Sequence, residues 1–314
     1  MTAPAPMPFG RRAALATALL LLVAGPACAQ ILPWEITVTE VETGRIRSLA
    51  QRLAKENLLY ELRLGNVRKS DLVETAEEID QIIESLAEGR PQRSIPPPWT
   101  PELHEQVLEV DRRWGPIRAI VFADSHRHHR VQRQFAPAET FAADPLLVRH
   151  FDRLTLALVA ESEKLLGIYT AECHKTGLDL CDVATQVGYS EMLLERATKE
   201  AIYIKSGIAA QTNREQLAET LAAYEKLVDA STSDPFLAAA VDPSRGPTAK
   251  ALGELIASLQ GDWDSMARQL RLLQAGDEQN FDIGILLRIQ SQLVAKIERV
   301  TAALMRYATL TYGA

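Results

Sequence analysis

Apolar residues recur at three- and four-residue steps along most of this chain, and this spacing constrains its fold more than any other feature. Two such series are Ile46, Leu49, Leu53, Tyr60 and Leu64, and then Leu72, Ala76, Ile79, Ile83 and Leu86. The spacing places apolar side chains on one face of an α-helix. Because no useful length of sequence alternates with a period of two, the pattern predicts an all-α protein.

Capping and breaking residues divide the first half into four predicted helices. Ser70 can cap the second helix, and Gly89 should end it before a proline-rich linker. Thr100-Pro101 has the form of a helix start, with a capping hydroxyl followed by proline at the first helical position. Asp144-Pro145 should begin a fourth helix that ends near Lys175.

The second half repeats the pattern of the first. The segment 44–56 aligns without gaps with the segment 188–200, and the later Trp114 has a counterpart in Trp263. The aligned identities are Gly44/Gly188, Leu49/Leu193, Arg52/Arg196, Lys55/Lys199 and Glu56/Glu200. We interpret the repeat as a duplication and predict two tandem antiparallel four-helix bundles, residues 30–178 and 179–314.

The first 29 residues have the form of an export signal. Arg11 and Arg12 precede the apolar run 13–25, and Ala27-Cys28-Ala29 follows as a small-x-small cleavage pattern. The sequence predicts Sec-type export and cleavage between Ala29 and Gln30, with the mature protein in a periplasm. An uncleaved anchor fits less well, since 13 apolar residues span roughly 20 Å of a bilayer core of roughly 30 Å.

Charge and motifs exclude several classes of function. The formal charge of −7 becomes −9 after loss of the two signal arginines, which argues against a nucleic-acid-coating protein. The sequence contains no Gly-x-Ser-x-Gly elbow, phosphate loop, dinucleotide fingerprint or His-Glu-x-x-His motif. We therefore expect a non-enzymatic protein without a cofactor or a metal ion.

Two cysteines remain in the predicted mature chain, Cys173 and Cys181. They flank the turn between the two predicted bundles, and an oxidising compartment favours a disulfide between them. A metal site that recruits His174 is the alternative, and the disulfide is preferred.

A second cluster of polar residues, Ser125-His-Arg-His-His-Arg, lies before the fourth predicted helix. His126 and His129 could meet on one helical face, whereas His128 points elsewhere. Two histidines without further ligands make a poor zinc site, and neighbouring arginines would repel a cation. We interpret the cluster as a solvated basic patch, with a metal site as the alternative.

The block Gly44-Arg-Ile-Arg-Ser-Leu-Ala-Gln-Arg-Leu-Ala-Lys55 resembles the opening helix of the sensor domain of type IV pili methyl-accepting chemotaxis transducers. The same family includes the periplasmic sensor of nitrate/nitrite-responsive histidine kinases. Ile95-Pro-Pro-Pro and Trp114-Gly-Pro suit the pattern, and the resemblance covers most of 36–175 and, more faintly, 181–311. It implies antiparallel helical bundles that sense small ligands at a dimer interface.

The resemblance also suggests which residues bind the ligand. In the nitrate-sensing branch a Gly-x-x-Arg-x-x-x-x-Arg block supplies the anion-binding arginine, and Gly44, Arg47 and Arg52 match it here. A guanidinium group offers planar, permanently charged donors that suit a flat oxyanion. Arg47 and Arg52 lie roughly 140° apart around a helix, so a shared site would use the same arginine from two facing helices.

The repeat leaves a structural alternative open. Arg47 aligns with Glu191, which would repel an anion, whereas Arg52 aligns with Arg196. These arginines could instead line a solvated face or pair with carboxylates such as Glu56.

The sequence as a whole predicts an exported, non-catalytic sensor. It would bind a small, nitrate-like anion through Gly44, Arg47, Arg52 and Arg196, form a homodimer, and signal through a membrane receptor or kinase. The alternative is a structural or adaptor protein that dimerises, or docks on a receptor bundle, without a small ligand.

Overall fold

The computed structural model describes residues 31–131, 145–177 and 180–312. The predicted signal peptide and its cleavage site between Ala29 and Gln30 lie outside these residues. The histidine cluster falls in a helix whose side chains from residue 123 to residue 131 are also outside the description. Neither prediction is tested.

The described residues form nine α-helices and no strand, which confirms the all-α fold. The helices are α2 (Pro33–Leu62), α3 (Lys69–Glu88), α4 (Pro101–Val131), α5 (Pro145–Lys175), α6 (Leu180–Lys205), α7 (Ala210–Thr232), α8 (Pro235–Ala240), α9 (Pro247–Gln274) and α10 (Ile283–Tyr312). None of the described helices has both the length and the apolar character needed to cross a membrane.

Local sequence explains where several helices begin and end. The Thr100 hydroxyl accepts a hydrogen bond from the backbone N–H of Leu103 at 3.1 Å, which caps α4 as predicted. Gly89 ends α3 with φ of 77°, a backbone conformation that glycine adopts without steric cost. The predicted cap at Ser70 is wrong, because the N-cap of α3 is Arg68, two residues earlier, and Asp71 accepts the backbone N–H of Arg68.

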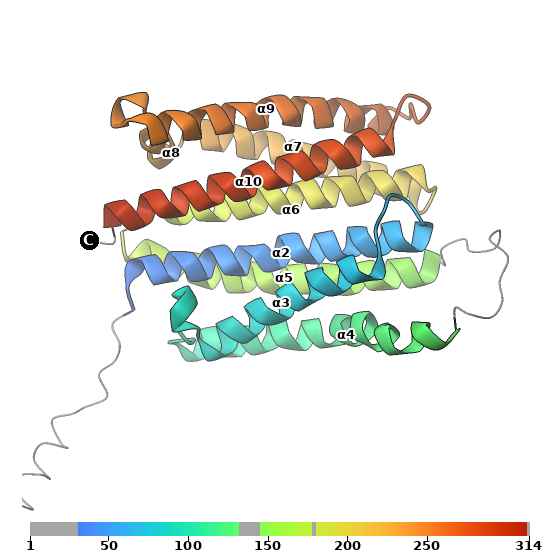
Figure 1. Cartoon of the computed structure of the whole chain (residues 1–314), viewed down its shortest axis with the longest axis horizontal. Helices are drawn as coiled ribbons and strands as arrows, with labels where there is room; N and C mark the ends of the chain where they lie inside the picture. The colour runs from blue at the N-terminus through green and yellow to red at the C-terminus, as the bar shows by residue number, and fades with distance from the viewer. Residues whose placement is uncertain (1–30, 132–144, 178–179, 313–314) are drawn as a thin grey trace, which may run out of the picture. The chain divides into compact units, whose positions relative to one another are not determined.

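The helices from Pro33 onward cluster into one compact unit. Helix α2 packs against α3 and α5, and α4 packs against both of these helices to complete a first set. Helix α6 packs against α7 and α10, and α9 packs against both of these to complete a second set. Figure 1 shows α2 and α6 side by side between the two sets, and they pack together as extensively as α2 packs on α5. The division into two bundles, residues 30–178 and 179–314, stays a prediction.

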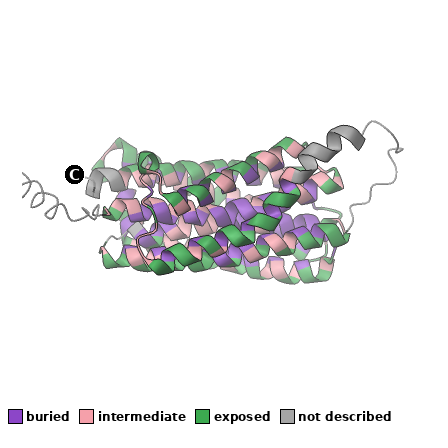
Figure 2. Ribbon diagram, turned by 90° about the horizontal axis from the view of Figure 1, so that it is seen from below, coloured by how far each residue is buried: buried purple, intermediate pink, exposed green. Residues whose placement is uncertain are grey.

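Side-chain burial follows this arrangement. One apolar cluster is built from α2 to α5 around Trp114, and another from α6 to α10 around Trp263. A further cluster joins the two sets, with Leu58 of α2, Val148 of α5 and Ile202 of α6 packed together. Figure 2 shows the buried residues concentrated on the inner ribbons, and the outer faces of the surrounding helices are largely exposed. The helices α2 and α6 therefore form the centre of the fold.

Polar contacts recur in both halves at similar places. Thr75 of α3 donates a hydrogen bond to Glu56 at 2.8 Å, and Thr220 of α7 donates one to Glu200 at 3.2 Å. Glu56 and Glu200 are an aligned pair of the repeat, separated by 144 positions. The contacts place α3 beside α2 and α7 beside α6 in the same register.

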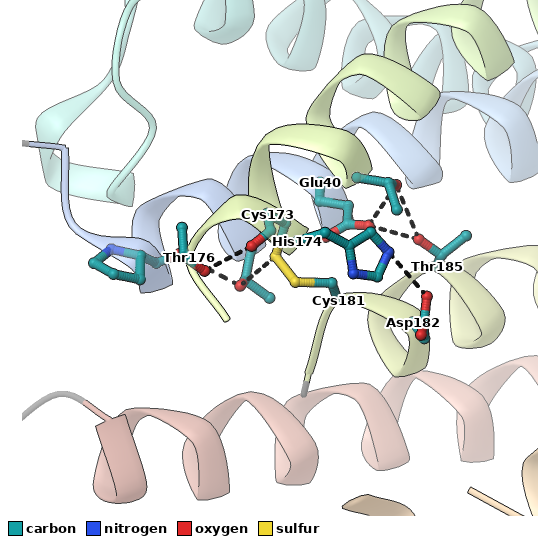
Figure 3. The surroundings of a disulfide bond; sticks show 10 residues. Glu40, Cys173, His174, Thr176, Cys181, Asp182 and Thr185 are labelled. Carbon is teal, nitrogen blue, oxygen red and sulfur yellow. Dashed lines mark hydrogen bonds and ion pairs between the residues drawn. A yellow bond between two sulfur atoms is a disulfide. The ribbon is translucent and has the colours of Figure 1, made fainter. Parts of the chain in front are cut away.

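A disulfide joins α5 to α6. Cys173 and Cys181 are bonded, their Cα atoms lie 5.9 Å apart, and both residues are completely buried. Figure 3 shows Glu40 of α2 beside this bond, where its Oε1 accepts hydrogen bonds from Thr170 at 2.7 Å and Thr185 at 2.6 Å. Burial raises the pKa of Glu40. The two sulfur atoms are bonded to each other, so they are not available as thiolate ligands for a metal ion.

Replacing Cys173 and Cys181 together by alanine should lower the free energy of unfolding by about 2–3 kcal/mol, because the short cross-link restricts the unfolded chain. Urea unfolding with and without dithiothreitol measures the effect, and the double variant serves as its own control because the reductant should not change it. Equal stability of the reduced and oxidised wild-type protein would contradict the prediction.

Candidate functional site

The two central helices approach each other closely at a pair of glycines. Gly44 of α2 and Gly188 of α6 face each other, and a Cβ atom built on Gly188 would lie 3.7 Å from the Gly44 Cα. Glu40 reaches Thr185 before this point and Arg52 reaches Glu195 after it, so α2 and α6 run parallel. The aligned glycines of the repeat thus form the crossing point between the two halves.

Arg47 lies at this crossing and is buried, with 4% of its surface exposed. Its Nε and Nη2 atoms have no hydrogen-bond partner among the described residues. Its Cζ atom lies 5.6 Å from the ring centroid of Tyr189, close enough for a cation–π contact. Burial lowers the pKa of Arg47, and the charge of Glu163 opposes the shift. The described residues therefore supply this buried cation with no hydrogen-bonded counter-charge.

The two glycines border the guanidinium group. A Cβ atom would lie 3.7 Å from Arg47 Nη2 if built on Gly44, and 3.8 Å from it if built on Gly188. The two glycines therefore place no side chain against this nitrogen on the side where the two helices meet. The structure thus brings together Gly44 and Arg47, two of the four predicted ligand-binding residues.

Arg52 is engaged elsewhere. Its Nη2 lies 3.1 Å from Glu191 Oε1, and its Nε donates to Glu195 Oε1 at 3.2 Å. These contacts cross from α2 to α6, so Arg52 binds carboxylates of the opposite half. Glu191, the aligned counterpart of Arg47, therefore forms an ion pair with Arg52.

Arg196 pairs within its own helix. Its Nε donates to Glu200 Oε1 at 2.8 Å, the i to i+4 pairing that the sequence offered as an alternative to ligand binding. A ligand-binding role for Arg52 or Arg196 stays a prediction, and the free hydrogen-bonding capacity lies at Arg47.

Two important residues at this interface were not singled out by the sequence. Tyr189 supplies the aromatic face beside Arg47, and Glu195 is the buried carboxylate that meets both Arg52 and Lys55. Lys55 lies 2.6 Å from Glu195 Oε2 and donates to Gln290 of α10 at 3.2 Å. Tyr189 and Glu195 lie within the aligned segment, one and seven positions after Gly188.

Comparison with known families supports the predicted resemblance. Residues 42–136 match the family model PilJ, described as the N-terminal part of type IV pili methyl-accepting chemotaxis transducers. The match begins in α2 and includes Gly44, Arg47 and Arg52, so this segment is similar to the sensor domain of chemotaxis transducers. The matched range ends before α5 and does not include α6. No curated protein and no solved structure matches the chain.

Proposed function

From the match of residues 42–136 to a chemoreceptor sensor family, we propose that this chain is an exported, non-catalytic sensor that binds a small oxyanion at Arg47. The anion would lie between α2 and α6, beside Gly44 and Gly188. The sensor domains of this family are typically periplasmic, which agrees with the predicted export signal. Because the matched family consists of chemotaxis transducers, we propose that the chain signals through a membrane receptor or kinase.

One observation carries the proposal: Arg47 is buried and its guanidinium group has unsatisfied donors. Leaving a charged group buried without a partner costs several kcal/mol. The other buried cations of α2 and α6 are satisfied, since Lys55 faces Glu195 and Lys199 faces Asp152. A planar oxyanion could accept two parallel N–H bonds from Arg47 and supply the missing charge.

The arrangement of α2 and α6 also suits a ligand at an interface. The family resemblance implies a site between equivalent helices of two copies, and here two aligned segments of one chain meet in parallel. Only one of the two aligned positions is an arginine, because Glu191 takes the other and pairs with Arg52. We therefore propose one anion for each chain, bound without help from the predicted homodimer.

Replacing Arg47 by methionine should abolish anion binding and, without anion, raise the free energy of unfolding by about 1–3 kcal/mol because unsatisfied buried donors are removed. A thermal-shift series with nitrate, nitrite, sulfate and chloride on the mature protein measures both effects. At an anion concentration of 100 times the Kd, the wild-type protein should gain about 2.7 kcal/mol.

Arg45→Met is the matched control, because Arg45 lies two positions away on α2 and pairs with Glu42 and Glu78. It should bind the anion as the wild-type protein does. Gly188→Ala keeps the charge but places a methyl group beside Arg47 Nη2, so it should weaken binding. Absence of any response to the oxyanions, or equal responses of wild type and Arg47→Met, would overturn the proposal and favour the adaptor alternative.

A further inference from the structure

A pocket of about 410 Å³ lies in the second half, between α6, α7, α8, α9 and α10. This size falls within the range of small-molecule sites in proteins. Its walls are mainly aliphatic, and no charged side chain is among the described residues that line it. Tyr224 and Trp263 form one wall, with their rings stacked at a centroid distance of 3.7 Å.

The first half offers an internal comparison. The contacts Thr75–Glu56 and Thr220–Glu200 align α3 with α7 at a spacing of 145 positions. At this spacing Ile82, Ile83 and Leu86 correspond to Leu227, Val228 and Ser231. The three residues of α3 are buried in the core of the first half, whereas their three counterparts are only half-buried and line the pocket.

The segments that follow α3 and α7 explain this difference. After α3, the linker places Ile95 in the core with no exposed surface, and Trp99 packs on Tyr169 with ring centroids 5.6 Å apart. After α7, the chain forms α8 instead, and Leu237 and Val241 line the pocket without filling it. The second half thus has an apolar pocket at the level where the first half buries the corresponding side chains of α3.

We propose that this pocket binds an uncharged, largely apolar small molecule. Several of its aliphatic side chains remain partly exposed to water, so a ligand that covers them gains the free energy of apolar burial. The two serine hydroxyls of the wall already have hydrogen-bond partners: Ser231 donates to Gln186 Oε1 at 3.1 Å, and Ser190 donates to the Val187 carbonyl at 2.7 Å. A charged ligand would find no counter-charge in this wall and would lose its hydration.

Two probes of the same shape test the chemistry. N-phenyl-1-naphthylamine is neutral and fluoresces in apolar surroundings, and 1-anilinonaphthalene-8-sulfonate differs from it by one sulfonate group. The neutral probe should bind saturably, one molecule for each chain, and the sulfonate at least about tenfold more weakly. The titrations are repeated with Arg47→Met, so that binding of the sulfonate probe at the proposed anion site does not contribute to the measured affinity.

Variants that fill the pocket locate the binding. Ala257→Phe and Gly253→Leu, both on the α9 wall, should each weaken binding of the neutral probe by at least about tenfold and keep the helical circular dichroism. Ala251→Phe is the matched control, since Ala251 is an exposed residue of α9 outside the pocket lining, and it should bind as wild type. No saturable binding, equal binding of both probes, or unchanged binding in the folded filling variants would overturn the proposal.

Discussion

Replacing Glu195 by alanine should lower the free energy of unfolding by about 3–5 kcal/mol, because it leaves the buried Lys55 without its counter-charge and removes one of the two carboxylates that pair with Arg52. Glu195 is 1% exposed and lies 2.6 Å from Lys55 Nζ and 3.2 Å from Arg52 Nε. Burial alone would raise the pKa of Glu195, but Lys55 and Arg52 outweigh it and lower this pKa. The carboxylate is therefore charged at neutral pH and holds α2 against α6.

A surface pair provides the matched control. Glu225 and Arg271 form an ion pair in which both side chains are at least half exposed, so Glu225→Ala should cost less than about 1 kcal/mol. The double variant Glu195→Leu/Lys55→Met removes both buried charges and should be less destabilised than Glu195→Ala. Urea unfolding at pH 7 compares the four proteins, and similar losses for Glu195→Ala and Glu225→Ala would contradict the prediction.

Glu195 also illustrates what the sequence could not reveal. Helical spacing predicted the all-α fold because the apolar stripe is a local property that a helix expresses directly. The burial of a glutamate depends instead on which neighbour its helix meets. Glu195 aligns with Gln51, and nothing in either segment indicates that Arg52 and Lys55 cross from the other half to meet it.

The candidate ligand site also combines features that the sequence predicts with features that depend on tertiary structure. Gly44 and Arg47 could be selected from the sequence because they match a family block, and the structure brings them together at the helix crossing. Whether an arginine is paired depends on the tertiary structure. Arg52 pairs with carboxylates of α6, and Arg196 pairs with a carboxylate of its own helix. Arg47 has no hydrogen-bonded carboxylate among the described residues.

Raising the pH from about 4.5 to about 7 should lower the free energy of unfolding through Glu56, by up to about 3 kcal/mol. Burial raises the pKa of Glu56 from 4.5 to about 7, although the hydrogen bond from Thr75 and the charge of Lys55 partly oppose the shift. Between these two values the folded protein binds more protons at Glu56 than the unfolded chain does. The contribution of Glu56 to stability is therefore fully present below pH 4.5, is lost as the pH rises, and is absent above pH 7.

Glu56→Gln isolates this contribution, because its amide oxygen can still accept the hydrogen bond from Thr75 but carries no charge. The variant should match the wild-type protein near pH 4.5 and exceed its stability above pH 7. Glu40, Glu191 and Glu200 also have raised pKa values, so both proteins should keep a common downward slope. The informative quantity is thus the difference between variant and wild type in urea unfolding at each pH. A difference that does not change with pH would show that Glu56 is ionised in the folded protein at its ordinary pKa.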